Sequence, residues 1–137
     1  MALRTFEWTK AENEAKQTLK KFGATSFARP DWLCQHPFDG SWFLVEVKEQ
    51  ERFQPRAADG SLGILGPEGG HGISIFQFER REEFRKATGV RTLLIIKEVP
   101  TGQWLCGYLD ELAKGMAFKT NVNKKIIFPL KSFRKFR

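Results

Sequence analysis

Three charged side chains, Asp31, Glu46 and Lys48, have the types and the spacing needed to hold a divalent metal beside a phosphate. Asp31 lies in one short apolar segment, and Glu46 and Lys48 lie in a second one that follows a turn. Because strand side chains alternate between faces, Glu46 and Lys48 should point to the same side of their strand. Carboxylate oxygens are the ligands that Mg2+ prefers, and a lysine can stabilise charge on a phosphate. The spacing therefore predicts a metal-dependent site for phosphoryl chemistry.

The two segments that carry these residues, 29–34 and 42–48, are expected to form a hairpin. The Asp39-Gly40 pair lies between the two apolar runs, a pattern typical of hairpins, although this connection is longer than a two-residue turn. In such a hairpin Val45 and Val47 would face the layer opposite to the charged side chains.

These residues resemble the PD-(D/E)xK nuclease superfamily, specifically its Holliday-junction-resolvase-like branch. The two halves of the motif are Pro30-Asp31 and Glu46-Val47-Lys48. The resemblance extends from residue 12 to about residue 96, in the order helix, strand, strand, helix, strand. It implies an α/β fold with a restriction-endonuclease-like core, in which helices flank a mixed central sheet and further strands follow at the C-terminal end.

The resemblance also implies an activity, that of a metal-dependent endodeoxyribonuclease which cuts branched DNA during recombination and repair. Asp31 and Glu46 would bind Mg2+ or Mn2+, with the Val47 carbonyl as a further ligand. Lys48 would stabilise the developing charge or position the attacking water, and the products would carry 5'-phosphate and 3'-hydroxyl ends. A junction resolvase is expected to be a homodimer, because two symmetric strands must be cut.

Other functions remain open at this stage. A nicking, flap-cutting or restriction-type nuclease would use the same site, and only its substrate preference would distinguish it from a resolvase. A non-catalytic DNA-binding protein on the nuclease fold would need no metal, and the intact Asp31, Glu46 and Lys48 argue against it.

The N-terminal region predicts an amphipathic helix over residues 6–22, with Gly23 available to end it. Glu12 lies on the apolar stripe of this helix, together with Trp8 and Ala15. A carboxylate turned toward a core is costly without a partner. The resemblance implies that Glu12 contacts the metal or its waters, and the alternative is a glutamate at the helix edge that reaches solvent.

A second helix is predicted over residues 75–88 and a fully apolar strand over residues 92–96. Such a strand is usually covered on both sides, which favours a central position in the sheet. In many nucleases of this superfamily a glutamine on this helix supports the site, so Gln77 is a candidate. The alternative is an amide at the edge of the core. The arginines at 80, 81 and 85 are most simply part of a solvated face with intrahelical ion pairs.

The segment over residues 54–72 is rich in glycine and proline and predicts a mobile loop next to the site. His71 could reach a DNA phosphate from this loop, or it could simply be exposed. Farther along, the sequence predicts a strand over 104–108, a short helix over 109–114, and an edge strand over 126–130 because of its proline.

With 137 residues the chain is expected to form one domain, and 41% hydrophobic residues are ordinary for a globular protein. No window approaches the ~20 apolar residues of a membrane span. The N-terminus lacks a signal-peptide pattern, so a cytoplasmic location is expected. Two cysteines and two histidines, none in a metal-binding spacing, argue against a zinc site.

The net charge of +7 is concentrated at the C-terminal end, from residue 119 onward, where seven cations occur without an acidic residue. Such a segment suits binding to a phosphate backbone, although it could instead be a solubilising end. The predicted DNA contacts are His71, Lys124, Lys125, Lys131, Arg134, Lys135 and Arg137.

Overall fold

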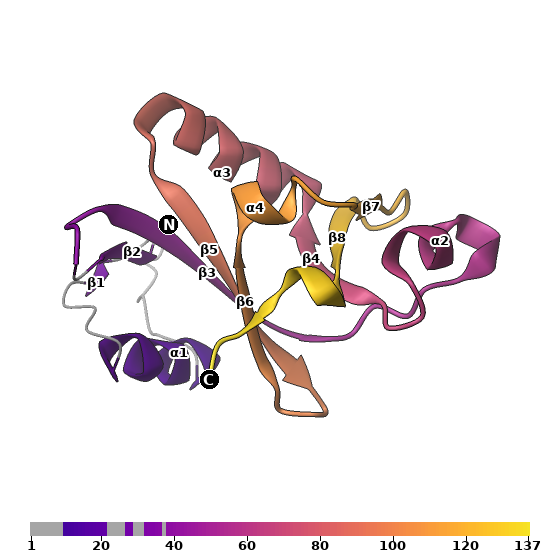
Figure 1. The fold of residues 1–137 in the computed structure, drawn as a ribbon, viewed down its shortest axis with the longest axis horizontal. Helices are drawn as coiled ribbons and strands as arrows, with labels where there is room; N and C mark the ends of the chain where they lie inside the picture. The colour runs from indigo at the N-terminus through magenta and orange to yellow at the C-terminus, as the bar shows by residue number, and fades with distance from the viewer. Residues whose placement is uncertain (1–9, 22–26, 29–31, 37) are drawn as a thin grey trace, which may run out of the picture.

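A mixed sheet of six strands, counted over the described residues, forms the centre of the fold (Figure 1). The computed structural model describes residues 10–21, 27–28, 32–36 and 38–137. The strands of this sheet are β1 (Phe27–Ala28), β2 (Trp32–Gln35), β3 (Trp42–Glu51), β5 (Arg91–Val99), β6 (Trp104–Tyr108) and β9 (Arg134–Lys135). Their order is β1-β2-β3-β5-β6-β9, in which β3 and β5 are parallel and every other neighbouring pair is antiparallel.

The predicted central strand is confirmed. Residues 92–96 lie in β5, between β3 and β6, and each is at most 9% exposed. Leu93 and Ile95 pack in one hydrophobic cluster, and Leu94 and Ile96 pack in another. Because the strand contributes to a core on each side of the sheet, it has no polar face.

Helices cover both faces of the sheet, as the resemblance implies. On one face, α1 (Lys10–Lys21) packs through Ala11 and Ala15 onto the cluster that contains Val45. On the other face lie α3 (Ile75–Thr88) and α4 (Leu109–Leu112). The predicted helix over 6–22 is described only as α1, since residues 6–9 and 22 lie outside the described residues. Gly89 ends α3 in the left-handed conformation, with φ of 78°.

A second, smaller sheet packs beside α3, and it changes the predicted place of the strand over 126–130. Its order is β4 (Gly70–Ser74), β8 (Lys125–Pro129), β7 (Phe118–Lys119), so β8 is the middle strand and not an edge. The edge prediction was wrong because Pro129 is the last residue of β8, where its missing N–H interrupts little of the ladder. The backbones of β4 and β8 approach each other closely. A Cβ at Gly72 would lie 1.7 Å from the carbonyl oxygen of Ile126.

The segment over residues 54–72, predicted as a loop, contains regular secondary structure. It contains η1, a 3-10 helix (Ala57–Asp59), then α2 (Ser61–Leu65) and the first residues of β4. The backbone N–H of Ser61 donates to Asp59 Oδ1 at 2.9 Å, a local turn that the glycine content concealed. Leu65 is 5% exposed and anchors the segment.

The basic C-terminal segment is built into the fold. It contains η2, a 3-10 helix (Leu130–Ser132), and β9, which pairs with β6. Phe133 and Phe136, 8% and 7% exposed, belong to the two hydrophobic clusters. These aromatic residues therefore serve the core instead of interleaving with phosphate-binding cations. No helix within the described ranges has the length and apolar character needed to cross a membrane.

Candidate active site

Glu46 and Lys48 lie two residues apart on β3, on the face of the sheet that α3 covers. Val45 is buried in the cluster under α1 and Val47 packs against it, so the intervening side chains must point to the opposite face. The predicted alternation is confirmed. The side chain of Glu46 is 13% exposed, and Lys48 is partly buried. The two charged groups therefore share one small patch with limited access to water.

The neighbouring strands fix the position of this patch. In β5, Leu94 is the register partner of Glu46, and Ile96 is that of Lys48. On the other side, the antiparallel register joins Val45 to Trp32 of β2. Asp31, the residue before Trp32, lies outside the described residues. Glu12 belongs to α1, but the position of its side chain is not described.

Arg81 of α3 is the partner of Glu46. Its Nε donates to Glu46 Oε1 at 3.0 Å, and its Nη2 contacts the same oxygen. The arginine side chain is 23% exposed. The charge pattern of the helix predicted a solvated face for Arg81, and this contact was not predicted. The sequence did indicate that Arg81 could reach the site, because Arg81 follows Gln77 by four residues and shares its helix face.

Gln77, the predicted glutamine of the site, is partly buried on α3, and its side chain makes no hydrogen bond to any described residue. Its role stays a prediction. The side chain that reaches from α3 to β3 is Arg81, one helical turn farther along.

Two polar groups of the patch have no partner among the described residues: Glu46 Oε2 and Lys48 Nζ. Oxygen donors suit Mg2+ or Mn2+, and Mg2+ commonly binds through one or two carboxylates while keeping several waters. The guanidinium beside Glu46 also shows that this position accommodates a cation. These features fit a divalent metal. Within the described part of the chain, no three acidic, histidine or cysteine side chains cluster closely enough to hold one.

His71 does not lie in a mobile loop, and its surroundings contradict the predicted contact with DNA. It belongs to β4, and its side chain is 0% exposed. Its Nε2 lies 2.6 Å from Glu98 Oε2, and its Nδ1 lies 2.9 Å from Gln50 Oε1. Burial lowers the pKa of His71, although the hydrogen bond to Glu98 acts in the opposite direction. Both ring nitrogens are therefore engaged inside the protein, away from any phosphate.

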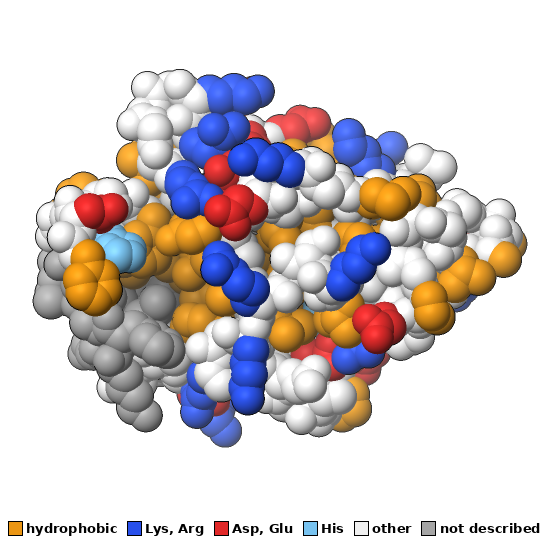
Figure 2. Space-filling model, in the orientation of Figure 1, with side chains coloured by type: hydrophobic (Ala, Val, Ile, Leu, Met, Phe, Trp, Pro, Cys, Tyr) orange, Lys and Arg blue, Asp and Glu red, His pale blue; other side chains and the backbone are white. Residues whose placement is uncertain are grey.

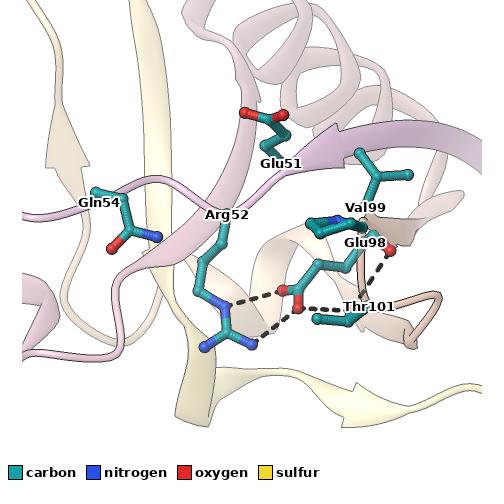
Figure 3. A pocket seen from close by; sticks show the side chains of 7 residues that line it. Glu51, Arg52, Gln54, Glu98, Val99 and Thr101 are labelled. Atoms are coloured by element: carbon teal, nitrogen blue, oxygen red, sulfur yellow. Dashed lines mark hydrogen bonds and ion pairs between the residues drawn. The ribbon is translucent and has the colours of Figure 1, made fainter.

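Glu98, near the end of β5, is the centre of this second polar cluster. Arg52 donates to both carboxylate oxygens, from Nε at 3.0 Å and from Nη2 at 2.8 Å, and Thr101 Oγ1 donates at 2.9 Å (Figure 3). The hydrogen bonds from Arg52 are the main reason that the pKa of Glu98 falls from its ordinary 4.5 to about 2. The cluster lies beside a pocket of about 430 Å³ lined by Glu51, Arg52, Gln54 and the turn after β5.

The predicted DNA-binding cations lie on more than one element. Lys124 and Lys125 are exposed at the turn into β8, and Lys131 and Lys135 are exposed in the C-terminal segment. Arg134 and Arg137 instead approach acidic residues, at 3.8 Å from Glu111 and 3.6 Å from Glu14 respectively. Figure 2 shows lysine and arginine side chains from the region of α3 to the C-terminal strand on one face, with acidic groups among them.

The fold is similar to that of a Holliday junction resolvase, Hjc, from the archaeal hyperthermophile Archaeoglobus fulgidus. The superposition has a TM-score of 0.55 and covers 90% of this chain and 88% of the resolvase, with 14% sequence identity. No protein-family model and no curated protein sequence matches the chain. At this level of identity the likeness establishes the fold, a restriction-endonuclease-like α/β core, and the activity must be argued from the site.

Proposed function

We propose that this protein is a divalent-metal-dependent endonuclease that hydrolyses phosphodiester bonds in branched DNA, as a Holliday junction resolvase does. The observation that carries the proposal is the patch on β3, where Glu46 and Lys48 lie on one face within a resolvase-like fold. A carboxylate can hold a divalent metal, and an ammonium on the same face can stabilise charge on a phosphate.

Asp31 is the proposed second carboxylate. It precedes Trp32, whose register partner Val45 precedes Glu46. The match of Pro30-Asp31 and Glu46-Val47-Lys48 to the two halves of the nuclease motif supports this choice. Glu12 of α1 is proposed as a further contact to the metal or its waters, and the Val47 carbonyl as a further ligand.

Within this site the side chains would have separate tasks. Asp31 and Glu46 would hold the cation, and the Mg2+ or Mn2+ would supply an activated water and neutralise charge on the phosphate. Lys48 would donate hydrogen bonds to a phosphate oxygen or to the attacking water, and its partly buried position strengthens this interaction relative to bulk water. Gln77 would orient these groups from α3.

The DNA backbone would contact exposed cations outside the site. Lys124, Lys125, Lys131 and Lys135 are the strongest candidates, because they are exposed and lie outside the hydrophobic clusters. Arg134 and Arg137 would first have to leave nearby carboxylates. Such contacts position a duplex without reading its sequence. Symmetric cutting of two strands would require a homodimer.

The test is cleavage of labelled four-way junction, flap and linear duplex, each with Mg2+ and with EDTA. A resolvase should cut the junction at symmetric positions and leave the duplex intact, and EDTA should stop the reaction. Equal cutting of flap or linear DNA would instead assign the site to a nicking, flap or restriction-type nuclease. Glu46→Gln serves as the matched control: cutting that this variant loses is assigned to the site, and cutting at the wild-type rate would refute the site.

One observation favours a second candidate, a non-catalytic DNA-binding protein on the same fold. Glu46 is already neutralised by Arg81, so this patch could be stable without a metal. Metal binding separates the two candidates: a non-catalytic protein should bind junction DNA equally well with and without Mg2+, and calorimetry should detect no metal site that depends on Glu46.

A further inference from the structure

The contact between Arg81 and Glu46 is one-sided. Two guanidinium nitrogens, Nε and Nη2, address a single carboxylate oxygen, Oε1. The other oxygen, Oε2, has no partner within the described residues. A structural arginine–carboxylate pair usually engages both oxygens in parallel, because that geometry gives the strongest interaction. The one-sided contact neutralises Glu46 while leaving it able to accept another ligand.

A guanidinium in this position competes with a metal. The guanidinium of Arg81 and a divalent cation at Glu46 carry like charges and repel each other. The two side chains are only 23% and 13% exposed, which limits solvent screening of that repulsion. In the absence of metal, however, the same guanidinium stabilises a carboxylate on a partly buried strand.

We propose that Arg81 is a positioning residue that acts as a placeholder cation: it neutralises Glu46 while no metal is bound and opposes metal binding until a DNA phosphate attracts it. The inference rests on the proposed function and adds a regulatory step to the same site. A phosphate offers arginine a bidentate acceptor at least as favourable as one carboxylate oxygen. Arrival of DNA would therefore release Glu46 for the metal.

The position of Lys48 would allow a phosphate to draw Arg81 away from Glu46. It lies on the same face of β3 as Glu46, and it has no partner in the described part of the chain. A phosphate that contacts Lys48 would therefore lie close to the guanidinium of Arg81 as well. Binding of DNA and binding of metal would then favour each other by the same factor, as thermodynamic linkage requires.

The first measurement is Mn2+ binding to the DNA-free protein by calorimetry. Arg81→Gln removes the charge but keeps a polar side chain, and it should tighten Mn2+ binding by about tenfold, the lower end of what changes beside a metal ligand produce. Arg80→Gln removes a charge from an exposed position of the same helix and should leave the affinity unchanged. Unchanged or weaker Mn2+ binding in Arg81→Gln would overturn the inference.

Glu46→Gln distinguishes a failure of this inference from a failure of the proposed function. If wild type and Arg81→Gln both bind Mn2+ only while Glu46 is intact, but with equal affinity, the placeholder role alone is lost. If no Mn2+ binding depends on Glu46, the proposed function is lost, and the inference with it. Arg81→Lys retains the charge and should bind Mn2+ as wild type does, which covers the case in which Arg81→Gln fails to fold.

A second measurement tests the transfer to phosphate. Arg81→Gln should reach half-maximal junction cleavage at a lower Mg2+ concentration than wild type, because the competing cation is gone. At saturating Mg2+ it should cleave more slowly, because the guanidinium no longer contacts the phosphate. A saturated rate equal to that of wild type would overturn the transfer step.

Discussion

Glu46 and Glu98 lie on neighbouring parallel strands, and each is paired with an arginine. The two carboxylates differ in how many of their oxygens accept hydrogen bonds. Glu98 on β5 accepts two hydrogen bonds at each oxygen, from Arg52, His71 and Thr101, and is 1% exposed. Among the described residues, Glu46 on β3 has a partner at one oxygen only, Arg81, and its side chain is 13% exposed. A carboxylate with every acceptor site filled can only hold the structure together. One with an open oxygen can also bind a ligand.

The surroundings of the two pairs support this distinction. The partners of Glu98 come from the end of β3, from β4 and from the turn after β5, so the cluster ties the large sheet to the small one. Within the described ranges, Glu46 has a single partner, which comes from a single helix. Removing Glu98 should therefore act mainly on stability, while removing Glu46 should act mainly on chemistry.

The largest expected effect is that of Glu46→Gln on cleavage. We expect the rate to fall by roughly 10³-fold or more, because a metal at this carboxylate would stabilise the transition state by several kcal/mol. Asp31→Asn should have the same effect. DNA binding should stay near the wild-type level or tighten, since the substitution removes a negative charge near the phosphate and leaves Arg81 able to contact it. Single-turnover cleavage and filter binding measure the two quantities, and cutting at the wild-type rate would refute the site.

Glu98→Gln should produce the opposite pattern. We expect the free energy of unfolding to fall by about 3 kcal/mol, because the substitution leaves Arg52 and His71 without their buried anion. Denaturant unfolding measures this loss. The cleavage rate per folded molecule should remain within a few-fold of wild type. A large loss of activity in a stable variant would place Glu98 in the active site and remove the contrast between the two pairs.

Acid should weaken the Glu98 cluster in a defined range of pH. The folded-state pKa of about 2 lies below the ordinary 4.5, so the folded protein releases this proton more readily than the unfolded chain does. The resulting stability is fully present above pH 4.5 and is lost as the pH falls toward 2. The loss should reach roughly 3 kcal/mol. Unfolding curves of wild type and Glu98→Gln should therefore converge with decreasing pH, and parallel curves would contradict the assignment.

The same comparison explains what the sequence could predict. Glu46 and Lys48 were recognisable because a strand alternates strictly, so two residues at this spacing must share a face. The central position of β5 followed from its unbroken apolar run. Both inferences depend on local periodicity alone.

The Glu98 cluster and the contact of Arg81 depend instead on contacts between residues distant in sequence. His71 and Glu98 are separated by 27 positions, and Arg81 and Glu46 by 35. A histidine in a glycine-rich segment resembled a loop residue, because the glycines that allow two strands to approach closely also occur in turns. Likewise, Phe133 and Phe136 alternate with cations in sequence, and only the fold reveals that they are buried.

Lys48→Ala should slow cleavage by about 10²-fold, since removing one stabilising donor from a site of this kind costs that much. Mn2+ affinity should change little, because the ammonium acts on phosphate or water and does not coordinate the ion. Calorimetry with Mn2+ and single-turnover kinetics give the two values. A variant that loses stability but keeps its specific activity would make Lys48 a structural residue of β3.

The smallest expected effect concerns the exposed cations of the C-terminal segment. Deleting this segment would remove β9 and two buried phenylalanines, so charge substitutions are the better test. Lys131→Ala together with Lys135→Ala should reduce the slope of log affinity against log salt by up to ~1.8, at roughly 0.9 per phosphate contact. The change should be the same on junction and on duplex DNA, because backbone contacts carry no sequence or branch information.

Lys114→Ala is the matched control, since this lysine is also exposed but is not among the predicted DNA contacts. Its salt slope should equal that of wild type. Cleavage at saturating DNA should be unchanged in the double variant, because neither lysine belongs to the patch on β3. An unchanged slope in the double variant would show that these lysines only raise solubility. The DNA backbone would then have to contact Lys124, Lys125 or the arginines of α3.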